Sequence, residues 1–306
     1  MHNARHTLVA VAGLMLNALV WGVSWWPFRH LHALGLNPLW ATALIYGVSS
    51  AAILAWRPRA LGELFSTPQL WLIVLASGST NAAFNWAVTQ GDVVRVVLLF
   101  YLMPVWAALL ARWLLGERLT TLVSVRLMLA LVGAMVVLWP PGGGLPLPRQ
   151  PMDWLGMVGG FFFALNNVLL RKLAQTPPEA RGLAMFAGGT LVAGGLAALL
   201  AASGAGSPLP APSAQWLVPV AALSLAFLVA NLGLQYGAER LPSNLTAVVM
   251  TAEIVFATGS AVILGAEQLN RQALIGGSLI VAAILLAAVR PRRPALPVHP
   301  PRETPT

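Results

Sequence analysis

Residues 81–120 read NAAFNWAVTQGDVVRVVLLFYLMPVWAALLARWLLGERLT, and residues 231–270 read NLGLQYGAERLPSNLTAVVMTAEIVFATGSAVILGAEQLN. At a shift of 150 residues the two stretches align without a gap and superpose these pairs: Asn81 on Asn231, Asn85 on Gln235, Trp86 on Tyr236, Val105 on Val255, Glu117 on Glu267 and Leu119 on Leu269. Few residues are identical, so what repeats is the placement of polar and aromatic residues within apolar segments. A period this long predicts a duplicated half rather than a solenoid.

The composition is that of an integral membrane protein. The chain of 306 residues is 58% hydrophobic and 9% charged, with a mean hydropathy of +0.76, whereas charged residues make up about 25% of a soluble globular domain. The net charge of +9 would favour nucleic acid binding in a soluble protein. Here the basic residues stand singly between apolar runs or in the C-terminal tail, so we expect membrane topology to explain them and no nucleic acid partner.

The sequence predicts neither a metal site nor a cofactor. It contains no cysteine, and its five histidines lie at positions 2, 6, 30, 32 and 299, outside the apolar runs. A thiolate or buried imidazole site is therefore not expected.

Apolar runs long enough to cross a bilayer occur ten times, at about 17–25 residues each: 8–28, 38–56, 69–90, 93–115, 121–139, 154–171, 182–202, 215–237, 243–264 and 271–289. The first run follows a short basic opening, so a cleaved signal peptide is an alternative. Because the run is long, carries Asn17 and ends in Trp25-Trp26-Pro27, we interpret it as an uncleaved span.

The basic residues orient these spans. With the N-terminus in the cytoplasm, ten spans return the C-terminus there, and 14 of the 18 Lys and Arg residues fall inside. The other four are Arg29, Arg95, Arg149 and Arg271. This asymmetry follows the positive-inside rule and predicts a multi-pass membrane protein with both termini cytoplasmic.

Two halves are separated by the Pro- and Gly-rich run 140–151, which we interpret as an external linker. We place the first five-helix half at 1–145 and the second at 146–289. Because five is odd, the second half must enter the membrane inverted relative to the first. In secondary transporters with such repeats the substrate site lies near the midplane between the halves. The polar, Pro- and Arg-rich tail 290–306 is expected to be disordered.

Two features resemble a known family. They are the run Leu102-Met103-Pro104-Val105-Trp106 leading to Leu115-Gly116-Glu117-Arg118-Leu119, and the Trp21-Gly22 pair in the first span. They are similar to the EamA family of the drug/metabolite transporter superfamily, and the resemblance covers essentially the whole chain as two EamA-like halves. It implies an all-α inner-membrane carrier of ten transmembrane helices, often an exporter of amino acids or other small metabolites.

The second half departs from the family pattern at two points. Ala252-Glu253-Ile254-Val255 has Ile254 where the family usually has proline, and Ala266 separates Gly265 from Glu267. An intrahelical proline kinks a helix. The sequence therefore predicts a bend at Pro104 and none at Ile254.

Polar residues within the spans predict a substrate cavity, because such groups need partners or water in a membrane. Asn17, Trp21, Ser24 and Trp25 form one helical stripe, and Ser77, Asn81 and Asn85 form another. The candidate cavity residues are Asn17, Trp21, Ser24, Trp25, Asn81, Asn85, Trp86, Arg95, Asn166, Asn167, Asn231, Gln235 and Tyr236. The alternative is that the amides tie helices together, and that Trp86 and Tyr236 belong to the interfacial aromatic belt.

Glu253 is the candidate for proton coupling. It lies halfway along the ninth run with no basic residue nearby in sequence. A lone carboxyl group there is expected to be protonated at rest and to release its proton when a polar solute or water arrives. The alternative is a neutral Glu253 held by an interhelical hydrogen bond.

Arg95 has two interpretations as well. It could form a rim ion pair with Asp92, three residues earlier, or point into the cavity and attract a carboxylate.

The leading function is a secondary transporter that moves, and we expect exports, small amphipathic metabolites such as amino acids by alternating access. No Gly-x-x-x-x-Gly-Lys-Ser/Thr motif supports direct ATP drive. An integral-membrane enzyme is less well supported, because the spans carry no His, Cys or closely spaced carboxyl pair. A receptor or scaffold without flux would need longer loops. The expected partners are a small-molecule substrate and the lipid bilayer, and a homodimer stays open.

Overall fold

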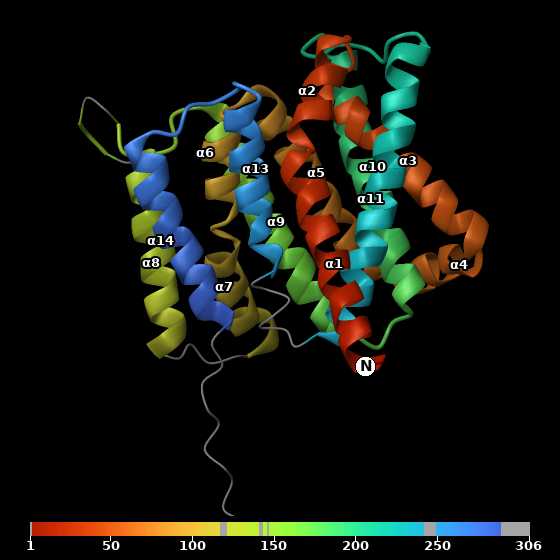
Figure 1. Cartoon of the computed structure of the whole chain (residues 1–306). Helices are drawn as coiled ribbons and strands as arrows, with labels where there is room; N and C mark the ends of the chain where they lie inside the picture. The colour runs from red at the N-terminus through yellow and green to blue at the C-terminus, as the bar shows by residue number, and fades with distance from the viewer. Residues whose placement is uncertain (1, 117–120, 141–142, 146, 242–248, 289–306) are drawn as a thin grey trace, which may run out of the picture.

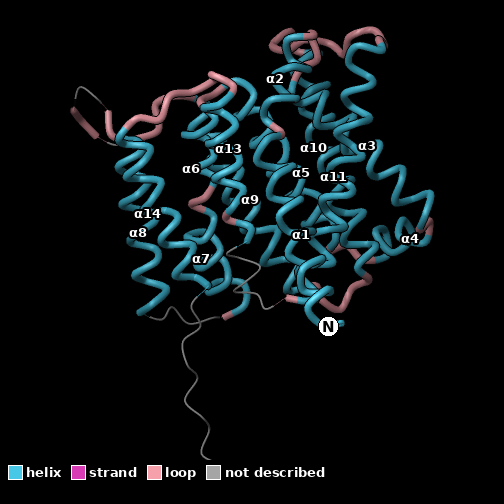
Figure 2. Tube along the Cα trace, viewed as in Figure 1, coloured by secondary structure: helices cyan, strands magenta, loops and turns pink. Residues whose placement is uncertain are grey.

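The computed structural model of the chain describes residues 2–116, 121–140, 143–145, 147–241 and 249–288. Within these residues every regular element is an α-helix (Figures 1 and 2). The predicted disorder of the tail 290–306 and the predicted motif residue Glu117 lie outside the described residues.

Helices of the first half have these bounds: α1 His2–Val23, α2 Trp25–Ala33, α3 Pro38–Trp56, α4 Arg59–Ser66, α5 Leu70–Gln90, α6 Val93–Phe100, α7 Met103–Leu115 and α8 Thr121–Leu138. Those of the second half are α9 Pro151–Lys172, α10 Pro178–Ala202, α11 Ala214–Arg240, α13 Ala252–Ile263 and α14 Arg271–Ala288. Several begin with a proline in the first turn, where its missing N–H costs nothing. Gly116 ends α7 with a φ of +70°, the left-handed conformation that glycine adopts without strain.

Seven helical segments of the described chain are long and apolar enough to cross a membrane, or eight if the bent pair α4–α5 is one span. The sequence predicts ten runs, and the difference has local causes. The axes of α4 and α5 differ by 103°, and α13 and α14 are short apolar helices. Large apolar side chains on the outside, such as Trp113 and Ile263, are more than three-quarters exposed, as lipid-facing residues should be.

The two halves pack against each other through antiparallel pairs of helices. α3 lies beside α10, where Gly47 faces Thr190 and Ala43 faces Gly194. α8 lies beside α14, and a Cβ on Gly133 would reach within 2.7 Å of the Gly276 oxygen. α8 and α14 are the last helices of their halves and run in opposite directions (Figure 1), which is the arrangement that inverted repeats produce.

The remaining contacts between the halves also occur in corresponding pairs. α5 packs along α9, and its counterpart α11 packs along α1. A Cβ on Gly13 of α1 would lie 2.7 Å from the Gly233 oxygen of α11, so the backbones approach closely there. One face of the first helix is thus packed closely against α11 and α13 of the second half.

Two spans are broken near their middles. The fourth span is interrupted at residues 101–102 between α6 and α7, as Pro104 predicts. Residues 249–250 are also helical, a turn follows at Thr251, and α13 begins at Ala252. The prediction that the second half lacks a break near Ile254 is therefore wrong. The second break contains no proline, and Gly22 of α1 packs against the backbone at Glu253 beside it.

Candidate functional site

A cavity of about 390 Å³ lies between the two halves. Residues from α1, α5, α9, α10, α11, α13 and α14 line it, together with the break between α6 and α7. In α9, α11 and α14 the lining residues fall in the C-terminal half of each helix, and these helix ends point to the face that carries the N-terminus (Figure 1). A smaller cavity of about 50 Å³ adjoins it and shares Trp21, Ser77, Asn81 and Asn231. The site is thus a central chamber to which both halves contribute.

Seven of the residues proposed from sequence line the larger cavity: Asn17, Trp21, Asn81, Asn166, Asn167, Asn231 and Glu253. The side chains of Asn17 and Asn166 are 1% and 3% exposed. The Nδ2 of Asn17 and the Oδ1 of Asn166 have no hydrogen-bond partner among the described residues. A buried polar atom without a partner is costly, so each of these two amides keeps an unused hydrogen-bonding position beside the cavity.

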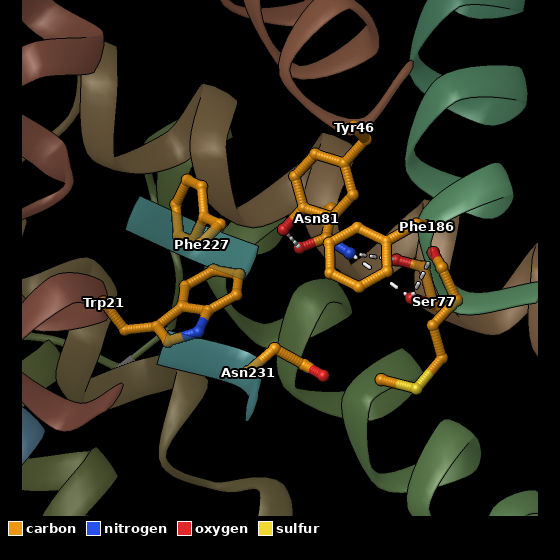
Figure 3. Close-up of a pocket in the computed structure, with 8 residues that line it drawn as sticks. Trp21, Tyr46, Ser77, Asn81, Phe186, Phe227 and Asn231 are labelled. Carbon is orange, nitrogen blue, oxygen red and sulfur yellow. Dashed lines mark hydrogen bonds between the residues drawn. The ribbon is translucent and has the colours of Figure 1, made fainter. Parts of the chain in front are cut away.

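Asn81 has partners and therefore also ties helices together. Its Oδ1 accepts a 2.6 Å hydrogen bond from the Tyr46 hydroxyl of α3, and its Nδ2 donates to the Ser77 carbonyl oxygen at 2.8 Å. The Ser77 hydroxyl in turn donates to the Met185 carbonyl of α10 at 3.0 Å. Figure 3 shows this network on one side of the smaller cavity, across from Trp21 and Phe227. Helix glue and cavity lining, the two readings of the sequence, both hold for Asn81.

A chain of aromatic rings forms the apolar wall. Ring centroids are 6.5 Å apart for Trp21 and Phe84, 4.6 Å for Phe84 and Phe100, and 5.4 Å for Phe100 and Phe163. Sequence reasoning missed the three phenylalanines, because a Phe within an apolar span looks the same whether it faces lipid or a cavity. Only their spacing from a polar residue could have indicated them: Phe84 lies three residues after Asn81, on the same helical face.

Glu253 lies in the first turn of α13, where the N-terminal end of a helix favours a negative group. Tyr101, at the break in the fourth span, lies beside its carboxyl group in the cavity lining. Glu253 is the single carboxyl group among the described lining residues, and none of these is basic. The break that begins α13 thus brings the acid to the chamber.

Other candidates lie outside the lining. The Ser24 hydroxyl donates to the Trp21 carbonyl at 2.8 Å between α1 and α2, and the Trp25 indole donates to Ser260 Oγ at 2.9 Å. Asn85 Nδ2 donates to Thr42 Oγ1 at 3.1 Å, so Asn85 ties α5 to α3.

Apart from Arg95, three residues of the candidate set remain. Trp86 packs in an apolar cluster of α3, α5 and α10. Tyr236 lies near His6 and beneath the Arg240 guanidinium, 3.7 Å from the ring centroid. The side chain of Gln235 is outside the described part of the structure.

Arg95 does not line the cavity and is held by another residue. Its Nε and Nη2 donate to the two oxygens of Asp153 at 2.7 and 3.0 Å, and its Nη1 donates to the Val137 carbonyl at 3.1 Å. The Asp92 carboxylate instead accepts from the Arg95 backbone N–H at 2.8 Å and caps α6. The ion pair of Arg95 therefore joins α6 to α9, whereas the two interpretations of the sequence were a pair with Asp92 or a position in the cavity. Asp153 lies 58 residues away, beyond the range of helical spacing rules.

A second polar bridge joins the halves at the same end of the bundle. Glu267, in the loop before α14, accepts hydrogen bonds from the Val93 backbone N–H at 3.1 Å and from Arg29 at 3.4 Å. Burial raises the pKa of Glu267, and nearby Asp92 adds to the rise, while the Val93 N–H and Arg29 act in the opposite direction. The end of the molecule opposite the N-terminus is thus tied across the halves by ionic contacts.

Comparisons with known proteins agree with this architecture. The model of the EamA-like transporter family matches residues 8–139 and again residues 150–289. No curated protein matches the chain. A solved structure titled "Crystal structure of protein" has a TM-score of 0.56 and 21% identity, over 92% of this chain and 95% of that one; this likeness bears on the fold alone. Because the family matches cover nearly all of the chain as two repeats, the protein belongs to the EamA-like transporter family, whose members are multi-pass membrane carriers of small solutes.

Proposed function

We propose that this protein is a secondary transporter of the bacterial inner membrane that exports small amphipathic metabolites through the chamber between its halves. The observation that carries the proposal is the placement of the polar groups. Asn17 and Asn81 come from one repeat, Asn166 and Asn231 from the other, and all meet at one cavity. Rocking of one half against the other would expose this chamber to alternate sides of the membrane.

The proposed topology has ten crossings, with five in each of two inverted repeats and both termini in the cytoplasm. The four basic residues expected outside support it, since Arg29, Arg95, Arg149 and Arg271 lie at or near the ends of spans that face away from the N-terminus. In this orientation the chamber lies towards the cytoplasm and the ionic bridges lie at the outer face. Such a state would load a solute from the cytoplasm, which fits export.

The function can be tested by counterflow in proteoliposomes. Purified protein should accelerate uptake of a labelled solute, screened from amino acids and amines, into vesicles preloaded with the unlabelled compound. Asn167→Trp, which places a bulky ring in the chamber, should lower this flux by roughly tenfold, because a blocked site loses the positioned solute contacts. Met128→Trp is the matched control, since Met128 is 60% exposed on the lipid-facing side. Equal flux in both variants would contradict the chamber as the transport site.

Proton coupling through Glu253 is part of the proposal. Its carboxyl group lines the chamber and has Tyr101 beside it, so a solute that enters could displace its proton. Glu253→Gln should abolish transport driven by a pH gradient while solute exchange without a gradient continues. Glu63→Gln, on the short helix α4 away from the chamber, should keep the pH dependence. If gradient-driven transport persists in Glu253→Gln, another group carries the proton.

A further inference from the structure

The described part of the chamber lining carries an acidic side chain. Glu253 is the single carboxyl group among the described lining residues, and no lysine, arginine or histidine accompanies it there. Arg95, the residue that the sequence offered as a carboxylate receptor, is bound by both oxygens of Asp153 instead. A carboxylate entering this chamber would meet an acidic side chain and, among the described lining residues, no cation.

The helix ends at the chamber do not reverse this balance. The N-terminal end of a helix attracts anions through its free N–H groups. At α13 that position is already occupied by Glu253 itself, which lies in the first turn. At α7 the first turn contains Pro104, which has no N–H. The N-terminal ends of α7 and α13 therefore do not offer a free anion site comparable with that of an ordinary helix.

The aromatic wall favours the opposite charge. Faces of Trp and Phe rings attract cations within about 6 Å of the ring centroid, and the attraction is larger where water is excluded. Trp21, Phe84, Phe100 and Phe163 form a continuous set of such rings in the lining. The same rings provide stacking surface for a flat apolar group.

An unpartnered amide oxygen adds a requirement for a donor. Asn166 Oδ1 is buried in the lining and accepts no hydrogen bond from the described residues. A primary ammonium group has three N–H donors, enough to reach both an amide oxygen and a carboxylate, whereas a quaternary ammonium has none. The volume of about 390 Å³ falls in the range of small-molecule sites, about 300–1,000 Å³.

We infer that the solute of this carrier is an organic primary amine with a flat apolar group and no carboxylate, its ammonium at Glu253 and Asn166 and its ring against the aromatic wall. The inference rests on the proposed transport function and narrows its substrate class. It favours amines over the amino acids that the family resemblance suggested. An alkyl amine is protonated at neutral pH, as a lysine side chain is. It therefore brings a positive charge that can pair with Glu253.

Four ligands with one ring and different charges test the assignment: 2-phenylethylamine, 2-phenylethanol, phenylalanine and 3-phenylpropionate. Titration calorimetry on the purified full-length protein at pH 7 should rank the amine tightest. It should exceed phenylalanine and phenylpropionate by about tenfold or more, since the amine gains a charge-assisted pair with Glu253 while each of the other two brings a carboxylate that meets no cation in the described lining. Tighter or equal binding of phenylalanine or phenylpropionate overturns the amine assignment, and so does a lack of binding by all four.

Variants separate the carboxylate from the ring contacts. Glu253→Gln should weaken phenylethylamine about tenfold and phenylethanol less than twofold, while Glu63→Gln changes neither. Equal losses for both ligands in Glu253→Gln overturn the ammonium contact. If this variant does not fold, the ligand ranking of the wild-type protein still decides. Counterflow with labelled phenylethylamine distinguishes the two proposals: tight binding without flux upholds the amine and rejects the transporter, and flux of another solute does the reverse.

Discussion

The fourth and ninth spans occupy the same place in the two repeats, and both are interrupted at the chamber. α7 begins at Met103 after Leu102, and α13 begins at Ala252 after Thr251. At the repeat shift of 150 residues the second start comes one residue earlier than the first. The first break has a proline two residues after its last non-helical residue, and the second has a carboxyl group there instead.

Both breaks are covered by a glycine from the first span of the other half. Gly160 of α9 lies against the Phe100 carbonyl, and Gly22 of α1 lies against the Glu253 carbonyl, where a Cβ would come within 2.8 Å of the oxygen. Because Gly22 and Gly160 have no side chain, their backbones can approach the turn of the broken span closely. The comparison indicates that a close contact between the repeats accompanies each break, and that the residues at the break decide what it presents to the chamber.

The outer ends of the two broken spans are held by different interactions. Removing each interaction should therefore lower the free energy of unfolding by a different amount. Asp153 is 2% exposed in its ion pair with Arg95 on α6, whereas α13 is tied by the hydrogen bond from Trp25 to Ser260. Asp153→Asn should lower the free energy of unfolding by about 3 kcal/mol, because a partly buried cation loses its partner. Ser260→Ala should cost about 1 kcal/mol.

Thermal and denaturant unfolding in detergent micelles would measure both losses. Glu179→Gln serves as the control, because Glu179 pairs with Arg57 at 3.8 Å on an exposed surface and such pairs contribute little. Similar losses for Asp153→Asn and Glu179→Gln would show that the α6 tie is no stronger than a surface contact.

The covering glycines should be equally important in the two halves. Gly22→Val and Gly160→Val each place a branched side chain against the backbone of a broken span, and overpacking of this kind costs about 1–3 kcal/mol. We expect similar falls in the unfolding midpoint and loss of counterflow in both. Gly259→Val on α13, where an added Cβ meets nothing within 4 Å, should be tolerated. A large effect in one half alone would mean that the two breaks are held by different means.

Pro104 should matter less than the glycines. If contact between repeats makes the break, Pro104→Ile, which copies Ile254 of the other half, should keep the fold and the flux. The expected loss is about 0.4–1 kcal/mol, the effect of proline on the unfolded chain. Unfolding and counterflow measured together would decide. A loss of flux as large as that of Gly160→Val would show that Pro104 causes the first break.

Glu267 links the outer ends of both broken spans and should give a small pH dependence. Because its pKa is raised in the folded state, the folded protein binds a proton at Glu267 more tightly than the unfolded chain does. This contribution is present below the ordinary pKa of about 4.3 and is lost as the pH rises through the raised value. Wild-type protein should therefore lose more thermal stability than Glu267→Gln between about pH 4 and pH 7. If the wild-type protein instead gained stability relative to the variant in this pH window, the pKa of Glu267 would be lowered in the folded state and the prediction would be wrong.

Much of the site was visible in the sequence as polar residues inside apolar runs. Asn17, Asn81, Asn166 and Asn231 were found in this way, because an amide in hydrocarbon needs a partner wherever it lies. The same signal also selected Asn85, which ties α5 to α3 through Thr42. Helical spacing gives the face of a residue but not its neighbour, so it could not separate the two uses.

The sequence by itself determined the membrane class, the orientation signal and the two-fold repeat, because apolar length, basic asymmetry and polar spacing are properties of single segments. Only the tertiary structure decided that Arg95 belongs to Asp153, that the phenylalanines form the chamber wall and that a break opens before Glu253 without a proline. These features depend on helices far apart in the chain meeting at close range. The stretches 81–120 and 231–270 are alike in pattern, and contact with the opposite half gives each its role.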